Sequence, residues 1–558
     1  MRHLYVQLLL AVTAVLGFLA STTPAQGVSF QSVWEQKISD TAGGFAGGLP
    51  DGAAFGTGIT SLGDLNGDGF EDVAVGSPMM GTGGVVWILF QDYRGQVQSS
   101  VQIGSAQLGN TVNLGDWFGW SVANIGDLDA DGVTDLAIGA PQASGEVGAF
   151  WVVFLNANAT VKAFFRHSTT QFGFQQLGSS LCPMGDFDGD GNLDLAVGAK
   201  NYASTSGTVW IYFLLPNGNK HYWNRIQNVG GINGPDQFGY SVAHLDDLNG
   251  NGYVEIAVGA PFADIVPAND DNRGKVHILE LELGFFYPGA PYASTRSQII
   301  IGDGLNGFPS GVLDDDDLFG TAVSAMGDAR ADDGIRHVAV GAALDDDGGV
   351  GRGAVWLLHV DPYTYPYRVW DVQKISSTSG GLQGPLDDSD VFGCSLALMS
   401  RSDAVTDLVV GAHYDDDGGP NRGAVYELKV FGYTGSARFR NNALGSPNPV
   451  GYTTEIPHLG LDWWAKVTNV GTNTYAQVVG YSAPLSLFLA GYGEYLLIDT
   501  ASPYLFATAV GSGQTISFYT YVPYEVAFVG LSCYTQAVAW GGTTGVTLHN
   551  AYDVIFGY

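Results

Sequence analysis

A unit of about 60 residues occurs six times along this chain and constrains the fold more than any other sequence feature. Each unit opens with a Phe-Gly pair, and a Leu-Gly pair takes its place in the third copy. The pairs are Phe55-Gly56, Phe118-Gly119, Leu177-Gly178, Phe238-Gly239, Phe319-Gly320 and Phe392-Gly393. A repeat of this length without a helical period indicates a β-repeat, whose units bury their apolar surface against their neighbours.

Each unit supplies three clear strands and a weaker fourth strand before the next Phe-Gly pair. One clear strand ends in Gly-Ala-Pro or a variant of it, as in LAIGAP (136–141), and the next follows a glycine, as in GAFWVVF (148–154). Short segments rich in β-branched and aromatic residues and bounded by Gly, Asp and Pro are typical of strands. Four strands per unit predict the blades of an all-β propeller over residues 30–432.

The two ends of the repeat region indicate how the ring closes. Gln36-Lys37-Ile38-Ser39 precedes the first unit and recurs as Gln373-Lys374-Ile375-Ser376 before the sixth, but no such segment follows the sixth unit. We therefore expect the N-terminal strand to complete the last blade, which removes two exposed sheet edges. Six units predict six blades, and a degenerate seventh blade stays an alternative.

An acidic loop separates the Phe-Gly pair from the Gly-Ala-Pro strand in the first four units. Positions 1, 3, 5 and 9 of this loop carry carboxylates or amides, position 6 is Gly, and position 7 offers a backbone carbonyl. Alternate side chains of a tight loop converge, and oxygen ligands without His or Cys suit Ca²⁺. At positions 1, 3, 5, 7 and 9 the candidate ligands are Asp64, Asn66, Asp68, Phe70 and Asp72; Asp127, Asp129, Asp131, Val133 and Asp135; Asp186, Asp188, Asp190, Asn192 and Asp194; and Asp247, Asn249, Asn251, Tyr253 and Glu255.

The first three loops predict three structural Ca²⁺ sites. The fourth loop has fewer charges and a longer last ligand, so metal binding there stays open. We expect the fifth and sixth loops, which carry Arg330 and Arg401, to have lost the metal. The alternative is a turn that only caps a hairpin. Two carboxylates about 5 Å apart repel by roughly 3 kcal/mol at an effective dielectric of about 20, and a bound dication would reverse that sign.

The order Phe-Gly, acidic loop, Gly-Ala-Pro resembles the FG-GAP repeats of integrin α-subunit propellers and of many secreted bacterial proteins. The resemblance covers about residues 30–432 and is most specific in units one, two and four. It implies an extracellular propeller for adhesion or for recognition of a protein or carbohydrate ligand. Integrin propellers are usually described with seven blades, which keeps that number as the alternative.

The N-terminus and the charge indicate the compartment and exclude some partners. Residues 1–26 are typical of a signal peptide, with an apolar run from Leu8 to Leu19 before a small-residue cleavage site. We therefore predict a secreted or cell-surface protein without membrane insertion after signal cleavage. A net charge of −33 disfavours nucleic acid and anionic membranes. Three cysteines do not make a disulfide framework.

Two further segments carry weaker signals. Residues 436–558 lack the repeat and are rich in alternating Tyr, Val and Phe, which predicts a small β-sandwich domain. Acidic runs that end in an arginine, such as DDDGGVGRGAV (345–355) and DDDGGPNRGAV (415–425), are interpreted as solvated loops with an Asp–Arg pair; another cation site or a ligand rim is the alternative.

No catalytic motif is found, so a calcium-binding recognition scaffold is the favoured function. The alternative is a secreted hydrolase or lyase that acts on extracellular polysaccharide. A cleft with two converging carboxylates outside the acidic loops would favour the enzyme. A shallow face rimmed by aromatic side chains, without such carboxylates, would favour binding.

Overall fold

The computed structural model describes residues 32–430 of the propeller region except for short segments, and only the strand backbones beyond residue 435. The segments outside the described residues are 1–31, 169–174, 203–205, 227–228, 233, 266–270, 287–289, 328–335, 362–366, 383, 401–405 and 431–435. The predicted signal peptide and the fifth and sixth acidic loops fall in these segments. The chain divides into two compact units, of which one is Ser29–Gly432 and the other contains all the strands after it.

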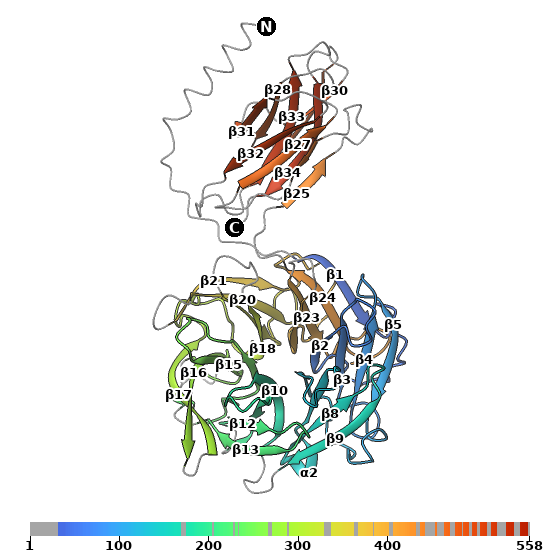
Figure 1. Cartoon of the computed structure of the whole chain (residues 1–558), viewed down its shortest axis with the longest axis vertical. Helices are drawn as coiled ribbons and strands as arrows, with labels where there is room; N and C mark the ends of the chain where they lie inside the picture. Colours follow the sequence, from blue (N-terminus) through green and yellow to red (C-terminus); the bar gives the residue numbers. More distant parts are fainter. Residues whose placement is uncertain are drawn as a thin grey trace. The chain divides into compact units, whose positions relative to one another are not determined.

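Each sequence repeat forms one antiparallel four-stranded sheet, and the sheets follow one another around a ring (Figure 1). Blade 1 consists of β2 (Ile59–Gly63), β3 (Asp72–Ser77), β4 (Val85–Gln91) and β5 (Val97–Ile103); blade 2 of β6 (Ser121–Gly126), β7 (Asp135–Ala140), β8 (Ala149–Leu155) and β9 (Val161–Ser168); blade 3 of β10 (Leu177–Gly185), β11 (Asp194–Ala199), β12 (Thr208–Leu214) and β13 (Lys220–Arg225); blade 4 of β14 (Ser241–His244), β15 (Val254–Ala260), β16 (Lys275–Phe286) and β17 (Ala290–Ile301); and blade 5 of β18 (Phe319–Gly327), β19 (Arg336–Ala342), β20 (Ala354–Asp361) and β21 (Arg368–Ile375). A four-residue helix, α2 (Ala143–Glu146), lies between β7 and β8.

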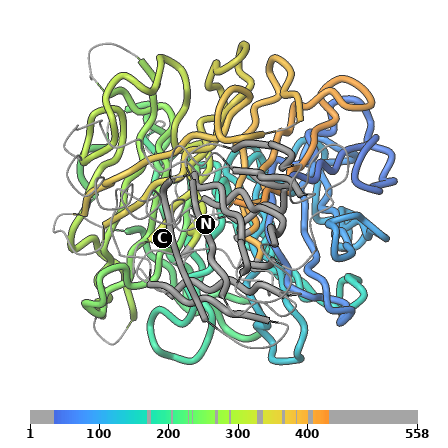
Figure 2. Tube along the Cα trace, turned by 90° about the horizontal axis from the view of Figure 1, so that it is seen from above, coloured from blue at the N-terminus to red at the C-terminus, as the bar shows by residue number. Residues whose placement is uncertain are grey.

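The last blade joins the two ends of the propeller region. It contains β22 (Leu396–Ser400), β23 (Thr406–Ala412) and β24 (Ala424–Val430), and its fourth strand is β1 (Ser32–Ser39) from the N-terminal end. Strand β1 pairs antiparallel with β24, and the blue and orange ends of the ring lie side by side in Figure 2. The predicted six-bladed propeller and its closure by the N-terminal strand are confirmed. No seventh four-stranded sheet occurs in the described part of the chain.

The aromatic residue of each Phe-Gly pair fills the space between two blades. Phe118 is fully buried in one apolar cluster with Val86 and Ile88 of blade 1 and Trp151 of blade 2. The rings of Phe118 and Trp151 meet edge to face with centroids 5.4 Å apart. Burial of such a side chain stabilises the fold by about 1.5–3 kcal/mol. Leu177 is equally buried in blade 3, so this position requires an apolar side chain rather than an aromatic one.

Two glycines bring neighbouring blades into backbone contact. The Phe-Gly glycine has a left-handed backbone, with φ +90° at Gly119 and +83° at Gly178. Its N–H donates to the Gly-Ala-Pro glycine of its own blade, as in Gly119 N to Gly139 O at 3.0 Å. Its carbonyl lies against the Gly-Ala-Pro glycine of the preceding blade, so that a Cβ added to Gly139 would lie 2.2 Å from Gly178 O. No side chain fits between these two backbones.

A side-chain hydrogen bond that recurs between blades completes this junction. A serine near the start of the first strand donates its hydroxyl to the Phe-Gly carbonyl of the next blade, and this contact occurs at four junctions. The donors and acceptors are Ser121 Oγ to Gly178 O, Ser180 Oγ to Gly239 O, Ser241 Oγ to Gly320 O, and Ser395 Oγ to Gly56 O, at 2.6–2.9 Å. The last of these joins blade 6 to blade 1.

Charged side chains tie strand β1 into blade 6. Lys37 Nζ lies 2.7 Å from Asp415 Oδ2 and 2.8 Å from Asp417 Oδ2. Arg422 Nη1 lies 2.6 Å from Asp40 Oδ2, just beyond β1. In blade 5, Lys374 makes the equivalent pairs with Asp345 and Asp347 at 2.6 and 2.8 Å. The repeated Gln-Lys-Ile-Ser segment therefore carries a lysine that holds the acidic run of its blade.

The second unit contains a five-stranded sheet of order β25-β34-β33-β28-β31, a three-stranded sheet β26-β27-β32 and the pair β29-β30. The strands are β25 (Ser436–Arg440), β26 (Tyr452–Thr454), β27 (Asp462–Thr468), β28 (Tyr475–Tyr481), β29 (Pro484–Leu489), β30 (Glu494–Ile498), β31 (Pro503–Val510), β32 (Thr515–Tyr521), β33 (Ser532–Trp540) and β34 (Thr547–Ile555). The all-β class agrees with the sequence, and the packing of a sandwich stays a prediction. None of the described residues form a helix that could span a bilayer.

We expect Gly139→Ala to lower the free energy of unfolding by about 1–3 kcal/mol, because the new methyl group meets a backbone carbonyl that cannot move without shifting a blade. Urea denaturation measures this change. Gly234→Ala is the control, since its Cβ would meet nothing within 4 Å and its backbone lies outside the left-handed region. Equal stability of the two variants would contradict the proposed role of the glycine contact.

We expect Lys37→Met and Lys374→Met each to cost about 3 kcal/mol, because each leaves a buried aspartate without its cation. Only Lys37→Met also loosens the strand that closes the ring. Hydrogen exchange of the β1 amides should therefore accelerate in Lys37→Met and stay slow in Lys374→Met. Both lysines also lie over an aromatic ring, Tyr426 at 5.2 Å and Trp356 at 5.1 Å, so the two variants are closely matched. Equal protection of β1 in both would argue against the closure role.

Candidate metal centres

The predicted acidic loops connect the first two strands of blades 1 to 4. Their last ligand begins or nearly begins the second strand: Asp72 opens β3, Asp135 opens β7, Asp194 opens β11, and Glu255 is the second residue of β15. Each of these four side chains is buried, whereas the side chains at positions 1, 3 and 5 are exposed or half-buried. Each loop thus presents exposed or half-buried candidate ligands around one buried carboxylate.

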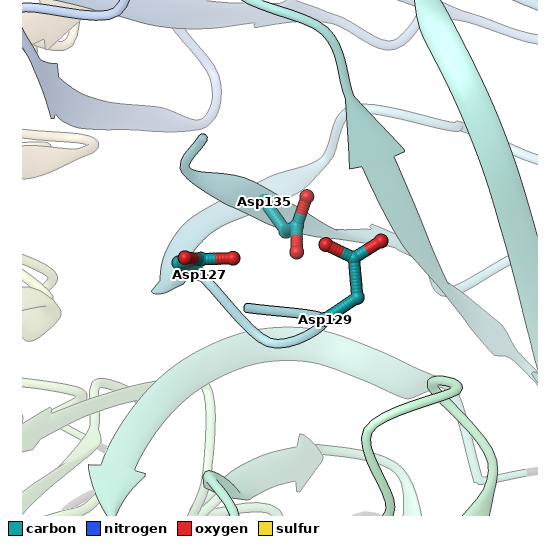
Figure 3. A group of neighbouring side chains, drawn as sticks. All are labelled: Asp127, Asp129 and Asp135. Carbon is teal, nitrogen blue, oxygen red and sulfur yellow. The ribbon is translucent and has the colours of Figure 1, made fainter. Parts of the chain in front are cut away.

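Two of the loops bring three carboxylates together. Asp127, Asp129 and Asp135 each place an oxygen within 4.8 Å of the others. Figure 3 shows these three carboxylates around a common space, with Asp135 coming from the strand and the other two from the loop. Asp186, Asp188 and Asp194 form the same arrangement in blade 3. All six aspartates are among the ligands predicted from the sequence, and their binding of a metal ion stays a prediction.

Backbone N–H groups of the second loop hold the carboxylates at positions 1 and 5. Asp127 Oδ1 accepts from Asp131 N at 2.9 Å, and its Oδ2 accepts from Gly132 N at 2.8 Å. Asp131 Oδ1 in turn accepts from Val133 N at 2.9 Å. Gly132 has φ +88°, a left-handed conformation that glycine adopts without strain. The sequence of the loop therefore sets the positions of its own carboxylates.

The ninth residue ties the loop to the third strand. Asp135 Oδ2 accepts from Leu128 N in the loop at 3.0 Å, and Oδ1 accepts from Leu155 N at the end of β8 at 3.1 Å. Asp72 makes the same pair of bonds to Leu65 N and Gln91 N. Burial raises the pKa of Asp135 to about 6, because charge in this position is poorly solvated. A nearby cation would compensate this cost.

Burial has the same effect in the neighbouring loops. It raises the pKa of Asp72 to about 6 and that of Asp194 to about 7. In both cases backbone N–H groups oppose the effect, and a second aspartate of the loop, Asp68 or Asp188, adds to it. The free loops are therefore electrostatically unfavourable at neutral pH, and a bound dication would relieve them.

The residues of the second loop fit a hard divalent cation. Asp129 Oδ1 is buried without a hydrogen-bond partner, which leaves one oxygen available for a ligand. Its Oδ2 lies 2.6 Å from Lys162 Nζ on β9, and the same ammonium lies 2.5 Å from Asp131 Oδ2. The Lys162 ammonium therefore already offsets part of the negative charge of Asp129 and Asp131. Carboxylate and carbonyl oxygens are the ligands that Ca²⁺ prefers.

The first loop keeps the fold of the second with an amide at position 3. Asp64 accepts from Gly67 N, Asp68 N and Gly69 N at 2.7–2.9 Å. The Asn66 amide donates to Asp68 Oδ2 at 2.9 Å. The candidate ligands of this loop are therefore three carboxylates and two neutral oxygens, from the Asn66 side chain and the Phe70 backbone.

The fourth loop uses its amides differently. The Asn249 amide donates to the hydroxyl of Tyr367 from blade 5, and the Asn251 amide donates to Glu280. Tyr367 also donates to Glu255 Oε1 at 2.6 Å. Burial raises the pKa of Glu255 to about 7. The Tyr367 hydroxyl thus joins two of the candidate ligands of this loop, Asn249 and Glu255.

An aspartate two residues before the Phe-Gly phenylalanine escaped the sequence analysis. Asp116 Oδ2 accepts from Asn113 N, Asp317 Oδ2 from Asp314 N and Asp390 Oδ2 from Asp387 N, at 2.7–2.8 Å. All three are buried and fold the turn before the Phe-Gly pair. Their constant offset from the phenylalanine was visible in the sequence and could have revealed them.

A pocket of about 270 Å³ lies on the axis of the ring and is lined by residues of all six blades. Trp120, Tyr240 and Tyr414 contribute aromatic rings to its wall, and His413 contributes an imidazole. The described residues that line it include no aspartate or glutamate. The pocket therefore differs chemically from the acidic loops.

Comparison with known proteins agrees with the repeat. The family model described as FG-GAP repeat matches residues 55–89, 118–153, 177–212 and 238–279, and a second FG-GAP repeat model matches residues 386–429. Integrin alpha-PS2 of Drosophila melanogaster is 30% identical over 229 residues, which are 37% of this chain and 15% of that protein. Integrin alpha-V of Gallus gallus is 32% identical over 210 residues, 36% of this chain and 19% of that protein.

The chain thus spans only a small part of the length of the integrin subunits it matches. Among solved structures, the V. cholerae biofilm matrix protein Bap1 aligns over 95% of this chain and 70% of that one, with 11% identity and a TM-score of 0.25. The matched segments show that this chain contains FG-GAP repeats, and its propeller is similar in sequence to part of the integrin α-subunits.

Proposed function

We propose that this protein is an extracellular recognition or adhesion scaffold whose propeller is braced by Ca²⁺. An FG-GAP propeller related to integrin α-subunits is a scaffold for ligand recognition or adhesion. The observation that carries the calcium proposal is the pair of three-carboxylate clusters in the second and third loops. The proposed location rests on the signal-like residues 1–26 and on the integrin relatives.

Calcium in these loops would act on stability rather than on chemistry. The first three loops join the first strand of a blade to the second. In the second loop, the carboxylate at position 9 also accepts hydrogen bonds from the loop and from the end of the third strand. A bound Ca²⁺ would neutralise the converging carboxylates and fix this three-strand junction. The fourth loop, with its amides bonded to Tyr367 and Glu280, is the weakest candidate.

The axial pocket supports recognition over the hydrolase or lyase alternative. Its wall contains aromatic rings and hydroxyl groups, and the described lining residues include no pair of carboxylates that could serve as acid and base. This is the aromatic face that favours binding. A glycan and matrix-protein array, probed with and without calcium, tests the function. Binding to one ligand class supports recognition, and turnover of a polysaccharide on the array would contradict it.

We expect removal of calcium by a chelator to lower the melting temperature markedly. Each occupied site adds about 2.7 kcal/mol when free Ca²⁺ exceeds its Kd a hundredfold. The double variant Asp129→Asn, Asp188→Asn should lose most of this response, as measured by thermal denaturation with and without calcium. Asp92→Asn, in an exposed turn outside the loops, is the control. An unchanged melting temperature of the wild-type protein in chelator would contradict the calcium brace.

We expect Lys162→Met to tighten calcium binding at the second loop by roughly a few-fold, because the ammonium competes with the ion for Asp129 and Asp131 and exposed ion pairs of this kind are weak. Calorimetric titration of the two proteins measures this difference. Lys220→Met on the outer strand of blade 3 is the control. Weaker binding by Lys162→Met would show that the lysine supports the site rather than competing for it.

A further inference from the structure

The axial pocket opens among the Phe-Gly and Gly-Ala-Pro turns. The residue directly after each Phe-Gly pair lines it: Thr57, Trp120, Ser179, Tyr240, Thr321 and Cys394. Burial raises the pKa of Tyr240 in blade 4, and the nearby Cys394 and Tyr414 of blade 6 add to this effect. Groups from two blades that are not neighbours therefore interact across this pocket.

A buried lysine lies between two of these rings. Lys200 takes the place of proline in the Gly-Ala-Pro motif of blade 3, and only 7% of it is exposed. Its Nζ lies 4.3 Å from the ring centroid of Trp120 and 4.2 Å from that of Tyr240. Cation–π contacts of this kind contribute about 0.5–2 kcal/mol, which offsets only part of the cost of burying a charge.

Within the described part of the chain, the Lys200 ammonium has neither a carboxylate nor a hydrogen-bond acceptor. Lys275 is the comparable case, with 8% exposed, and it donates to the Asp264 carbonyl at 2.5 Å. Burial alone lowers the pKa of Lys200 to about 7, and no acidic side chain opposes it. Although the chain is rich in aspartate, no described aspartate forms an ion pair with Lys200.

A second departure from Gly-Ala-Pro supplies another polar group. His413 takes the place of proline in blade 6, opposite blade 3 in a ring of six, and it lines the pocket. Its Nδ1 is buried without a hydrogen-bond partner, and its ring meets that of Tyr414 edge to face at 4.2 Å. Serines of the wall, such as Ser180 and Ser241, already donate to glycine carbonyls. His413 thus lines the pocket, and Lys200 lies against two of the aromatic rings that line it, while the described lining residues include no carboxylate.

We propose that the axial pocket binds the carboxylate of an acidic sugar residue, with Lys200 as its counter-ion. A carboxylate would supply the missing anion, and sugar hydroxyls would meet the tyrosine and histidine groups of the wall. The pocket is smaller than most drug-sized ligand sites, which suits one sugar ring better than an extended peptide. The proposal rests on the recognition function above and on none of the calcium loops.

Calorimetric titration with galacturonate and galactose tests this proposal, because the two sugars differ in the carboxylate. We expect wild-type protein to bind galacturonate and to bind galactose on the order of tenfold more weakly, the usual magnitude for a charged hydrogen bond. Lys200→Gln should lose galacturonate binding by the same factor. Lys220→Gln is the control, since Lys220 lies over Trp223 at 4.5 Å on the outer strand of blade 3 and outside the pocket.

Equal binding of the two sugars, no binding of either, or full galacturonate binding by Lys200→Gln would overturn the proposal. Tighter binding of an N-acetylated aspartyl peptide than of galacturonate would overturn the sugar assignment. If Lys200→Gln fails to fold, as judged by thermal denaturation, the comparison of the two sugars on wild-type protein still decides. A polymer that binds wild type and Lys200→Gln equally would contradict this site and leave the recognition function standing.

Discussion

The structure depends on a backbone contact between two glycines of neighbouring blades. The Phe-Gly glycine turns its carbonyl against the Gly-Ala-Pro glycine of the preceding blade, where a Cβ would lie 1.8–2.2 Å from that oxygen at all six junctions. The same carbonyl accepts a serine hydroxyl at four of them. Both halves of the repeat motif are therefore explained by one junction, and its repetition sets the spacing of the blades.

The acidic loop and the glycine junction lie at opposite ends of the same two strands. The first strand begins after the Phe-Gly pair and ends at the loop, and the second runs from the loop to Gly-Ala-Pro. A metal in the loop would stabilise each blade, while the glycines join the blades. The axial pocket opens among the Phe-Gly and Gly-Ala-Pro turns, so the proposed ligand and the proposed metals occupy separate ends of the blades.

Patterns local to one repeat were predictable, and contacts between distant repeats were not. Strand positions, ring closure and the clusters at Asp127 and Asp186 followed from residue types at fixed spacing. Lys162 reaches the second loop across a register shift between Phe154 and Leu155, which no spacing rule indicates. Tyr367 enters the fourth loop from another blade, 112 residues away from Glu255. The departure of Lys200 from the motif was visible in the sequence, but its place between two aromatic rings depends on the assembled ring.

Anomalous diffraction from a crystal grown with calcium tests the calcium brace most directly, because it locates each ion. The account predicts strong peaks within coordination distance of Asp127, Asp129 and Asp135 and of Asp186, Asp188 and Asp194, with a third peak in the first loop. Loops that keep their conformation with no anomalous peak near these carboxylates, at a calcium concentration that raises the melting temperature, would contradict it.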